Sequence, residues 1–129
     1  MTQRASTSYR PIGLAFHSVI DWLLVAAGLA GPVALGYSDQ LWPAAYTYGA
    51  VGFGALLNFA TDYPGGLVKL LPMRWHQFVE WTSPAPFIAG PWLLFPEAAE
   101  MKWLMLAIGA GIVLNTALTR KARAIPAPS

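Results

Sequence analysis

Two short stretches of this sequence, "HSVIDW" (His17–Trp22) and "HQFVEW" (His76–Trp81), share one pattern that decides how the rest of the chain is interpreted. In each stretch a histidine is followed four residues later by an acid, and a tryptophan comes directly after the acid. Residues four apart lie on the same face of a helix, so each stretch predicts a histidine and a carboxylate on neighbouring helical turns. The chain has 2 histidines, and both of them stand in this pattern.

The similarity between the two halves continues beyond these stretches. At the spacing of 59 residues that separates the histidines, Gly31-Pro32 falls on Gly90-Pro91. At a spacing of 57 residues, "GFGALLNFA" (Gly52–Ala60) matches "GAGIVLNTA" (Gly109–Ala117). Repetition of this kind predicts one structural unit used twice. We place repeat one at about residues 11–61 and repeat two at about residues 70–119.

The composition is that of a membrane protein. Of the 129 residues, 56% are hydrophobic and 11% are charged, whereas a soluble domain usually carries about a quarter charged residues. The absence of cysteine excludes disulfides, thiolate metal sites and iron–sulfur clusters. The net charge of +2 is small, and membrane topology explains the basic residues better than nucleic-acid binding does. We therefore expect residues 1–129 to form a single membrane domain.

Four apolar segments predict an all-α membrane protein with four transmembrane helices. They cover residues 12–35, 42–60, 70–95 and 103–118, each close to the roughly 20 residues that cross a bilayer core. Short connections make consecutive helices antiparallel neighbours. Both hairpins begin on the same side, so the repeats should be parallel and related by a pseudo-twofold axis along the membrane normal.

The basic residues predict the orientation of the chain. Seven of the 8 lysines and arginines fall on one side of the predicted helices, and Lys102 falls on the other side with Asp39, Glu97 and Glu100. Positive charge is enriched in cytoplasmic loops. The tails 1–10 and 120–129 are therefore expected in the cytoplasm.

The polar residues inside the predicted helices need partners, because a charged side chain within a membrane is costly. Asn58 and Asn115 lie in the same leaflet as the two histidine–acid pairs. We predict two equivalent clusters, or one joined network if the faces meet. The clusters would be His17–Asp21–Asn58 and His76–Glu80–Asn115. The paired glycines Gly52, Gly54, Gly109 and Gly111 are assigned to close helix packing.

Three roles suit these polar residues. They can be structural hydrogen bonds between helices, a proton path, or ligands in which His17 and His76 bind a haem or one of them binds a chlorophyll magnesium. Zinc or haem could be held only through the two histidines and the carboxylates, and we predict neither a metal site nor a catalytic residue. Ser18 and Ser83 lack the surroundings of a serine nucleophile.

The histidine–acid pattern, "GPWLLF" (Gly90–Phe95) and the linker "TDYPGGLVKLLPMRWH" (Thr61–His76) together resemble the SPW-repeat family of small bacterial integral membrane proteins. The resemblance implies two transmembrane helices per repeat and a Ser-Pro-Trp signature near the end of the first. The sequence departs from that signature, since Gly90 replaces its serine and repeat one reads Gly31-Pro32-Val33. The resemblance implies no activity.

The function predicted from sequence is that of a non-enzymatic accessory or structural subunit in the bacterial inner membrane. Its partners would be the lipid bilayer and either a larger membrane complex or further copies of itself. One alternative is a haem- or (bacterio)chlorophyll-binding subunit that uses His17 and His76. Another is a small channel or proton conductor, which the scarcity of polar residues in the outer half disfavours.

Overall fold

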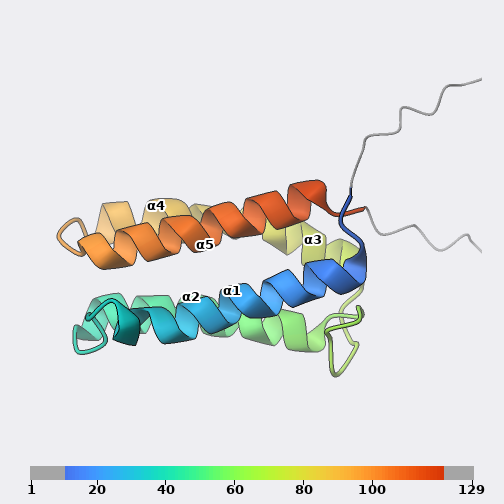
Figure 1. Ribbon diagram of the computed structural model, residues 1–129, viewed down its shortest axis with the longest axis horizontal. Helices are drawn as coiled ribbons and strands as arrows, with labels where there is room; N and C mark the ends of the chain where they lie inside the picture. Colours follow the sequence, from blue (N-terminus) through green and yellow to red (C-terminus); the bar gives the residue numbers. More distant parts are fainter. Residues whose placement is uncertain (1–10, 121–129) are drawn as a thin grey trace, which may run out of the picture.

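The computed structural model describes residues 11–120, and these residues form five α-helices without a named strand. The helices are α1 (Leu14–Ala34), α2 (Leu41–Ala60), α3 (Met73–Thr82), α4 (Pro84–Leu94) and α5 (Ala99–Leu118). They build four rods that run side by side, with both ends of the described chain at the same end of the bundle (Figure 1). We call that end the tail end. The prediction of an all-α fold is confirmed.

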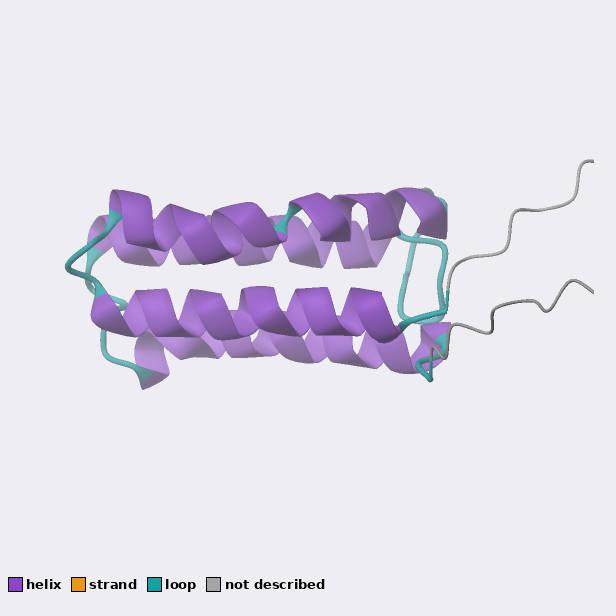
Figure 2. Ribbon diagram, turned by 90° about the horizontal axis from the view of Figure 1, so that it is seen from above, coloured by secondary structure: helices purple, strands orange, loops and turns teal. Residues whose placement is uncertain are grey.

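The third predicted segment is two helices, because prolines interrupt it. Pro84 and Pro86 cannot donate backbone hydrogen bonds, so α3 stops at Thr82 and α4 starts at Pro84. Ser83 between them keeps helical angles, φ −66° and ψ −27°, so the two helices lie end to end. Figure 2 shows the break in the middle of this rod, which we call the α3–α4 rod.

Two of the described helices, α1 and α5, are long and apolar enough to cross a membrane. The helix α2 has 20 residues but includes tyrosine, threonine and several glycines. The α3–α4 rod is divided at Ser83, and α3 carries a histidine and an acid. By length and hydropathy, two of the four predicted membrane-crossing segments therefore qualify as membrane spans.

The end of α1 shows how sequence sets a helix boundary. Gly36 has φ 77°, a left-handed conformation that glycine adopts without strain. The Tyr37 amide donates to the Pro32 carbonyl at 2.9 Å and the Gly36 amide donates to the Val33 carbonyl at 3.2 Å. These two bonds form a Schellman motif, which satisfies the last carbonyls of the helix. The chain then turns into α2.

The duplication is visible in backbone contacts between the two halves. Ile12, just before α1, pairs in parallel with Thr119, just after α5. Leu71, just before α3, pairs in the same way with Thr61, just after α2. Ile12 and Leu71 are separated by the same 59 residues as the two histidines. The start of each repeat is thus tied to the end of the other.

Helices of one repeat also pack closely against helices of the other repeat. A Cβ atom added to Gly31 on α1 would lie 2.3 Å from the Leu104 side chain on α5. A Cβ atom added to Gly90 on α4 would lie 2.0 Å from the Tyr46 hydroxyl on α2. Gly31 and Gly90 are equivalent positions of the two repeats. Each glycine therefore provides the space in which a helix of one repeat meets a helix of the other.

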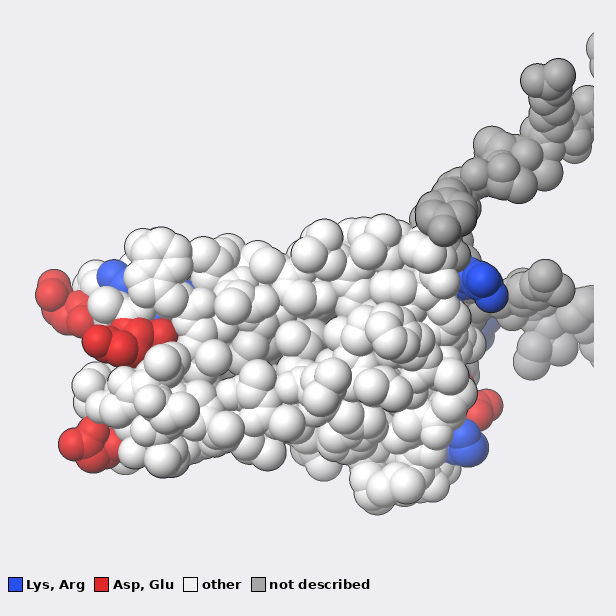
Figure 3. Space-filling model, in the orientation of Figure 1, with Lys and Arg blue, Asp and Glu red and all other residues white. Residues whose placement is uncertain are grey.

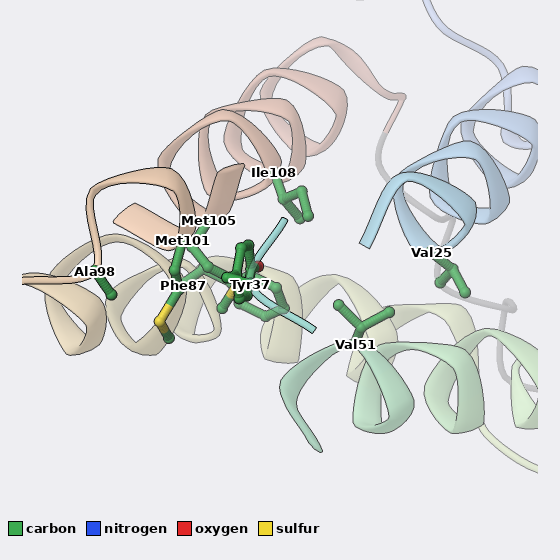
Figure 4. Close-up of a cluster of buried hydrophobic side chains, with 8 residues drawn as sticks. All are labelled: Val25, Tyr37, Val51, Phe87, Ala98, Met101, Met105 and Ile108. Atoms are coloured by element: carbon green, nitrogen blue, oxygen red, sulfur yellow. The ribbon is translucent and has the colours of Figure 1, made fainter. Parts of the chain in front are cut away.

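The interior of the bundle is divided into an apolar half and a polar half. The apolar half extends from the middle of the bundle to the loops opposite the tail end (Figure 4). Its buried side chains are Val25, Tyr37, Val51, Phe87, Ala98, Met101, Met105 and Ile108. The buried histidines, Asp21, Glu80 and Asn115 lie in the other half, near the tail end.

On the face drawn in Figure 3, the exposed charged side chains lie at the two ends of the bundle. Within residues 11–120, the only charged residues in the middle of a rod are Asp21 and Glu80, and both are buried. Large apolar side chains cover the outside between the ends, among them Leu23, Leu56 and Leu93, which are 63%, 69% and 79% exposed. The predicted tails, apart from Arg120, lie outside the described residues.

The four paired glycines do not share one role. A Cβ atom added to Gly109 would lie 2.6 Å from Ile88, and one added to Gly111 would lie 2.8 Å from the side chain of a leucine on α1. At Gly52 and Gly54 an added Cβ atom meets nothing within 4 Å. Within the described chain, the second pair is therefore closely packed and the first pair faces open space.

Alanine at the equivalent positions Gly109 and Gly52 should have opposite effects. Gly109→Ala forces a methyl group into packed side chains, which costs about 1–3 kcal/mol and should lower the melting temperature. Gly52→Ala enters open space and gains up to about 1 kcal/mol of helix propensity. Intrinsic tryptophan fluorescence during heating in detergent measures both. Equal destabilisation by the two variants would contradict the difference in packing.

Candidate metal centre

Four buried side chains from α1 and α3 meet in the polar half of the bundle. His17 and Asp21 stand on consecutive turns of α1, and His76 and Glu80 stand on consecutive turns of α3. Both histidines are 0% exposed, and the acids are 5% and 4% exposed. Because the two helical faces are turned toward each other, the joined network is the alternative that the structure contains.

The histidine Nε2 atoms and the carboxylates approach one another in four places. His17 Nε2 lies 3.3 Å from Asp21 Oδ2 and 3.2 Å from Glu80 Oε2. His76 Nε2 lies 3.2 Å from Asp21 Oδ2 and 3.2 Å from Glu80 Oε1. Each histidine therefore faces the acid of its own helix and the acid of the other repeat.

Two threonines fix the orientation of the imidazole rings. His17 Nδ1 lies 2.6 Å from the Thr119 hydroxyl, and His76 Nδ1 lies 2.7 Å from the Thr61 hydroxyl. Each threonine hydroxyl donates its own proton to a backbone carbonyl four residues earlier, at 2.5 and 2.6 Å. The hydroxyl oxygen must then accept from the imidazole, so Nδ1 carries a proton in both rings. In the neutral ring Nε2 is left as a lone-pair donor.

Neither Nε2 atom forms a hydrogen bond with its neighbours. Both are completely buried, and although carboxylate oxygens lie 3.2–3.3 Å away, the directions do not suit a hydrogen bond. Buried polar atoms are almost always satisfied, so this arrangement requires an explanation. The Nε2 atoms of His17 and His76 thus each lie beside carboxylate oxygens of both acids without a hydrogen bond to either.

Further donors hold the two carboxylates in place. Asn115 Nδ2 donates to Asp21 Oδ1 at 2.8 Å, and the Tyr63 hydroxyl donates to Asp21 Oδ2 at 3.1 Å. The Thr116 hydroxyl donates to Glu80 Oε2 at 2.9 Å. Burial and the neighbouring carboxylate raise the pKa of Tyr63, so this phenol stays a protonated donor.

The two asparagines are not equivalent, which corrects the prediction of two matching clusters. Asn115 bonds to Asp21 of the other repeat and to the His17 carbonyl, and not to Glu80 as expected. Asn58 is buried beside the acids, but within residues 11–120 it makes no hydrogen bond to either of them. Thr116 takes the place on Glu80 that symmetry assigns to Asn58.

The threonines and the tyrosine of the centre were not predicted from the sequence. Thr61 and Thr119 end the second helix of each repeat and follow the matched asparagines by three and four residues. They are 58 residues apart and so do not match at the spacings of 57 or 59, but the position of each next to a predicted helix end was a usable signal. Tyr63 and Thr116 have no counterpart of the same kind in the other repeat, and no sequence signal identifies them.

The geometry gives no support to a haem or chlorophyll held by His17 and His76. A macrocycle needs an open plane beside each ligating nitrogen, but here the carboxylates of Asp21 and Glu80 lie against both Nε2 atoms. The cavity next to the acids has a volume of about 50 Å³. Sites for cofactors of that size usually take about 300–1,000 Å³.

Comparison with known proteins gives no further guide to this site. No protein-family model, curated protein or solved structure matches the chain. Membership of the SPW-repeat family therefore stays a prediction from the motifs. The chemistry of the centre has to be inferred from its own geometry.

The unequal roles of the asparagines can be tested with leucine at each position. Asn115→Leu removes a donor from the buried Asp21 carboxylate, which should cost about 1–3 kcal/mol. Asn58→Leu removes no hydrogen bond to the acids and should cost less. Thermal melting in detergent compares the two variants. A larger fall in melting temperature for Asn58→Leu would contradict the stabilising role assigned to the Asn115 hydrogen bonds.

Proposed function

We propose that this chain is an integral membrane protein that binds one divalent transition-metal ion through His17, Asp21, His76 and Glu80. The observation that carries the proposal is the pair of buried Nε2 atoms that lack hydrogen bonds and face two carboxylates. No metal site was predicted from the sequence, which left open whether the two histidine–acid pairs meet. It did limit the possible ligands to these residues.

The distances suit direct coordination. A tetrahedral zinc ion with bonds of about 2.0–2.1 Å holds its ligand atoms about 3.3 Å apart. The nitrogen–oxygen separations in the centre are 3.2–3.3 Å, with His17 next to Oε2 and His76 next to Oε1 of Glu80. One ligand atom from each residue can be chosen so that all lie within 4.8 Å of one another. Glu80 presents both oxygens and can bind through one or two of them.

The outer partners are those that metal ligands usually have. A ligating histidine normally donates its second ring N–H to an oxygen, which fixes the tautomer and the ring orientation. Thr61 and Thr119 accept from Nδ1 of the two histidines. Ligating carboxylates are likewise hydrogen-bonded, as Asp21 and Glu80 are.

Charge balance supports a dication. Two carboxylates buried in a bundle with an apolar exterior carry two negative charges, which either two extra protons or one divalent ion can neutralise. Protons on both Nε2 atoms would also balance the charge, as ion pairs at 3.2–3.3 Å with the carboxylates, but neither Nε2 atom forms a hydrogen bond in this arrangement. Imidazole with carboxylate suits Zn²⁺, Fe²⁺, Mn²⁺ or Co²⁺, while Mg²⁺ and Ca²⁺ prefer oxygen ligands alone.

Four membrane-crossing rods form the second part of the proposal. The support is the apolar exterior between charged ends, which α2 and the α3–α4 rod share with the two apolar helices α1 and α5. Lys69, Arg74 and Arg120 at the tail end agree with cytoplasmic tails. The pseudo-twofold axis would then lie along the membrane normal. A bacterial inner membrane follows from the family resemblance alone.

The other functions predicted from sequence have less support. A non-enzymatic accessory subunit, in a larger complex or a homo-oligomer, stays a prediction, because it depends on partners outside the described chain. A channel would need polar side chains through the whole bundle. In the half opposite the tail end, buried apolar residues such as Val51 and Met105 surround a single described polar pair, Tyr37 and Thr47, which argues against such a path.

Metal analysis of the purified protein tests the proposal. After removal of bound metal with a chelator and exposure to Zn²⁺ or Co²⁺, we expect one ion per chain and, with Co²⁺, visible d–d absorption bands. The variant with both His17→Ala and His76→Ala should bind no ion. Asp21→Asn should weaken binding by more than about a hundredfold, since outer partners alone contribute about 10–100-fold. Asp39→Asn, an acid at the far end, is the matched control.

The pH dependence of binding gives an independent test. Protons compete with the ion for the histidines and carboxylates, so affinity should fall as the pH is lowered. Release of each ion should be accompanied by uptake of up to about two protons, because the ion and the protons neutralise the same two acids. Calorimetry in buffers of different ionisation enthalpy measures this uptake. Affinity that does not change with pH would contradict coordination by the histidines.

A further inference from the structure

The loop that joins α2 to α3, residues 61–72, presents large apolar side chains to the outside at the tail end. Leu67 and Leu70 are 73% and 77% exposed, and Val68 between them is 43% exposed. Figure 1 shows this loop at the tail end, where part of it extends past the side of α2. Grouped apolar side chains on a surface commonly mark a contact with a membrane or a protein.

The backbone of this loop is held against the end of α2. The Leu67 amide donates to the Phe59 carbonyl and the Leu70 amide donates to the Ala60 carbonyl, both at 2.9 Å. These bonds satisfy carbonyls of the last turn of α2, which lack partners within the helix. Near the start of the loop, the buried Tyr63 donates a hydrogen bond within the candidate centre. The inner side of the loop is thus occupied, and its leucines are left facing outward.

The two ends of the bundle carry opposite charge. Within residues 11–120, the tail end has the basic residues Lys69, Arg74 and Arg120 and one acid beside the loop. The opposite end has three acids and Lys102. On the face drawn in Figure 3, most of the acidic side chains accordingly gather at the end opposite the tail end. Basic residues beside an apolar surface suit the phosphates of anionic phospholipids, so this partner matches the tail end and not the other.

Aromatic side chains at the start of α3 indicate that the loop lies at the level of a membrane interface. Trp75 and Phe78 are both exposed, and their rings meet edge to face with centroids 6.1 Å apart. The Arg74 guanidinium lies 5.8 Å from the centroid of the Trp75 ring. Tryptophan is enriched at the level of the head groups in membrane proteins. Because α3 begins directly after the loop, the loop and Trp75 reach the interface together.

We infer that residues 64–72 form an interfacial anchor, whose apolar side chains enter the leaflet at the tail end while Lys69 and Arg74 bind the head groups of anionic phospholipids. The inference rests on the membrane-crossing part of the proposed function and does not depend on the metal ion. A protein surface would also cover the apolar side chains, but the adjacent basic residues favour phosphate groups.

Spin labelling in nanodiscs of phosphatidylglycerol and phosphatidylcholine tests the insertion of the loop. The chain contains no cysteine, so a single nitroxide can be attached at Leu70→Cys. Its collisions with oxygen should exceed those with a water-soluble nickel chelate, as expected about 5–10 Å into the boundary between head groups and acyl chains. Asp62→Cys, at an exposed acid of the same loop, is the matched control, and its label should collide mainly with the chelate.

Two results at Leu70 would overturn the anchor. A label that collides mainly with the nickel chelate faces water, and a label shielded from both reagents is covered by protein. A label at Leu56→Cys, on the outside of α2, separates this failure from failure of the membrane proposal. Oxygen contact at Leu56 together with either of these results at Leu70 overturns the anchor alone. Nickel contact at Leu56 overturns the membrane-crossing rods and the inference that rests on them.

Spin-labelled lipids test the match of charge. The preference of the protein for phosphatidylglycerol over phosphatidylcholine should fall by up to about fivefold in Arg74→Gln, because a basic residue near an anionic surface contributes about that factor. Lys69→Asn should lower it as well, and asparagine tolerates the left-handed backbone that Lys69 has at φ 52°. Lys102→Gln, at the opposite end, is the matched control. An unchanged preference in both tail-end variants would overturn the binding of anionic lipid.

Discussion

Two carboxylates buried inside a bundle with an apolar exterior set the requirement that the rest of this structure meets. Asp21 and Glu80 are the only charged residues within residues 11–120 that lie away from the ends of the bundle. A buried charge is costly unless it is paired or coordinates a metal. The histidines, the threonines behind them and the donors on the outer side of each acid all serve that requirement.

Duplication of one helical hairpin is enough to build this centre. One helical hairpin carries a histidine and an acid on one face, and by itself it cannot surround an ion. Two copies facing each other provide two nitrogens and two carboxylates, and each histidine then meets both acids. The threonine behind each histidine comes from the other repeat, so neither hairpin completes its own half of the centre.

The departures from symmetry are as informative as the symmetry. Thr116 occupies the place on Glu80 that Asn58 would have taken, which leaves the Asn58 amide beside the cavity. Gly109 and Gly111 are packed, whereas Gly52 and Gly54 are open. The two repeats therefore differ in how closely their second helices are packed at these positions. Two identical repeats would not have produced that difference.

The sequence by itself determined the helices, the duplication and the pairing of each histidine with an acid on one face. These are local properties, because spacing along a helix fixes which side chains share a face. The third segment was predicted as one helix. The break at Pro84 could have been predicted, because proline cannot donate a backbone hydrogen bond. The tertiary structure alone decided that the two faces meet, that Asn115 serves Asp21, and that Thr61, Thr119 and Tyr63 belong to the centre. Those contacts depend on how the rods are rotated against each other, and helix rotation is set by packing between distant residues that spacing along the chain does not encode.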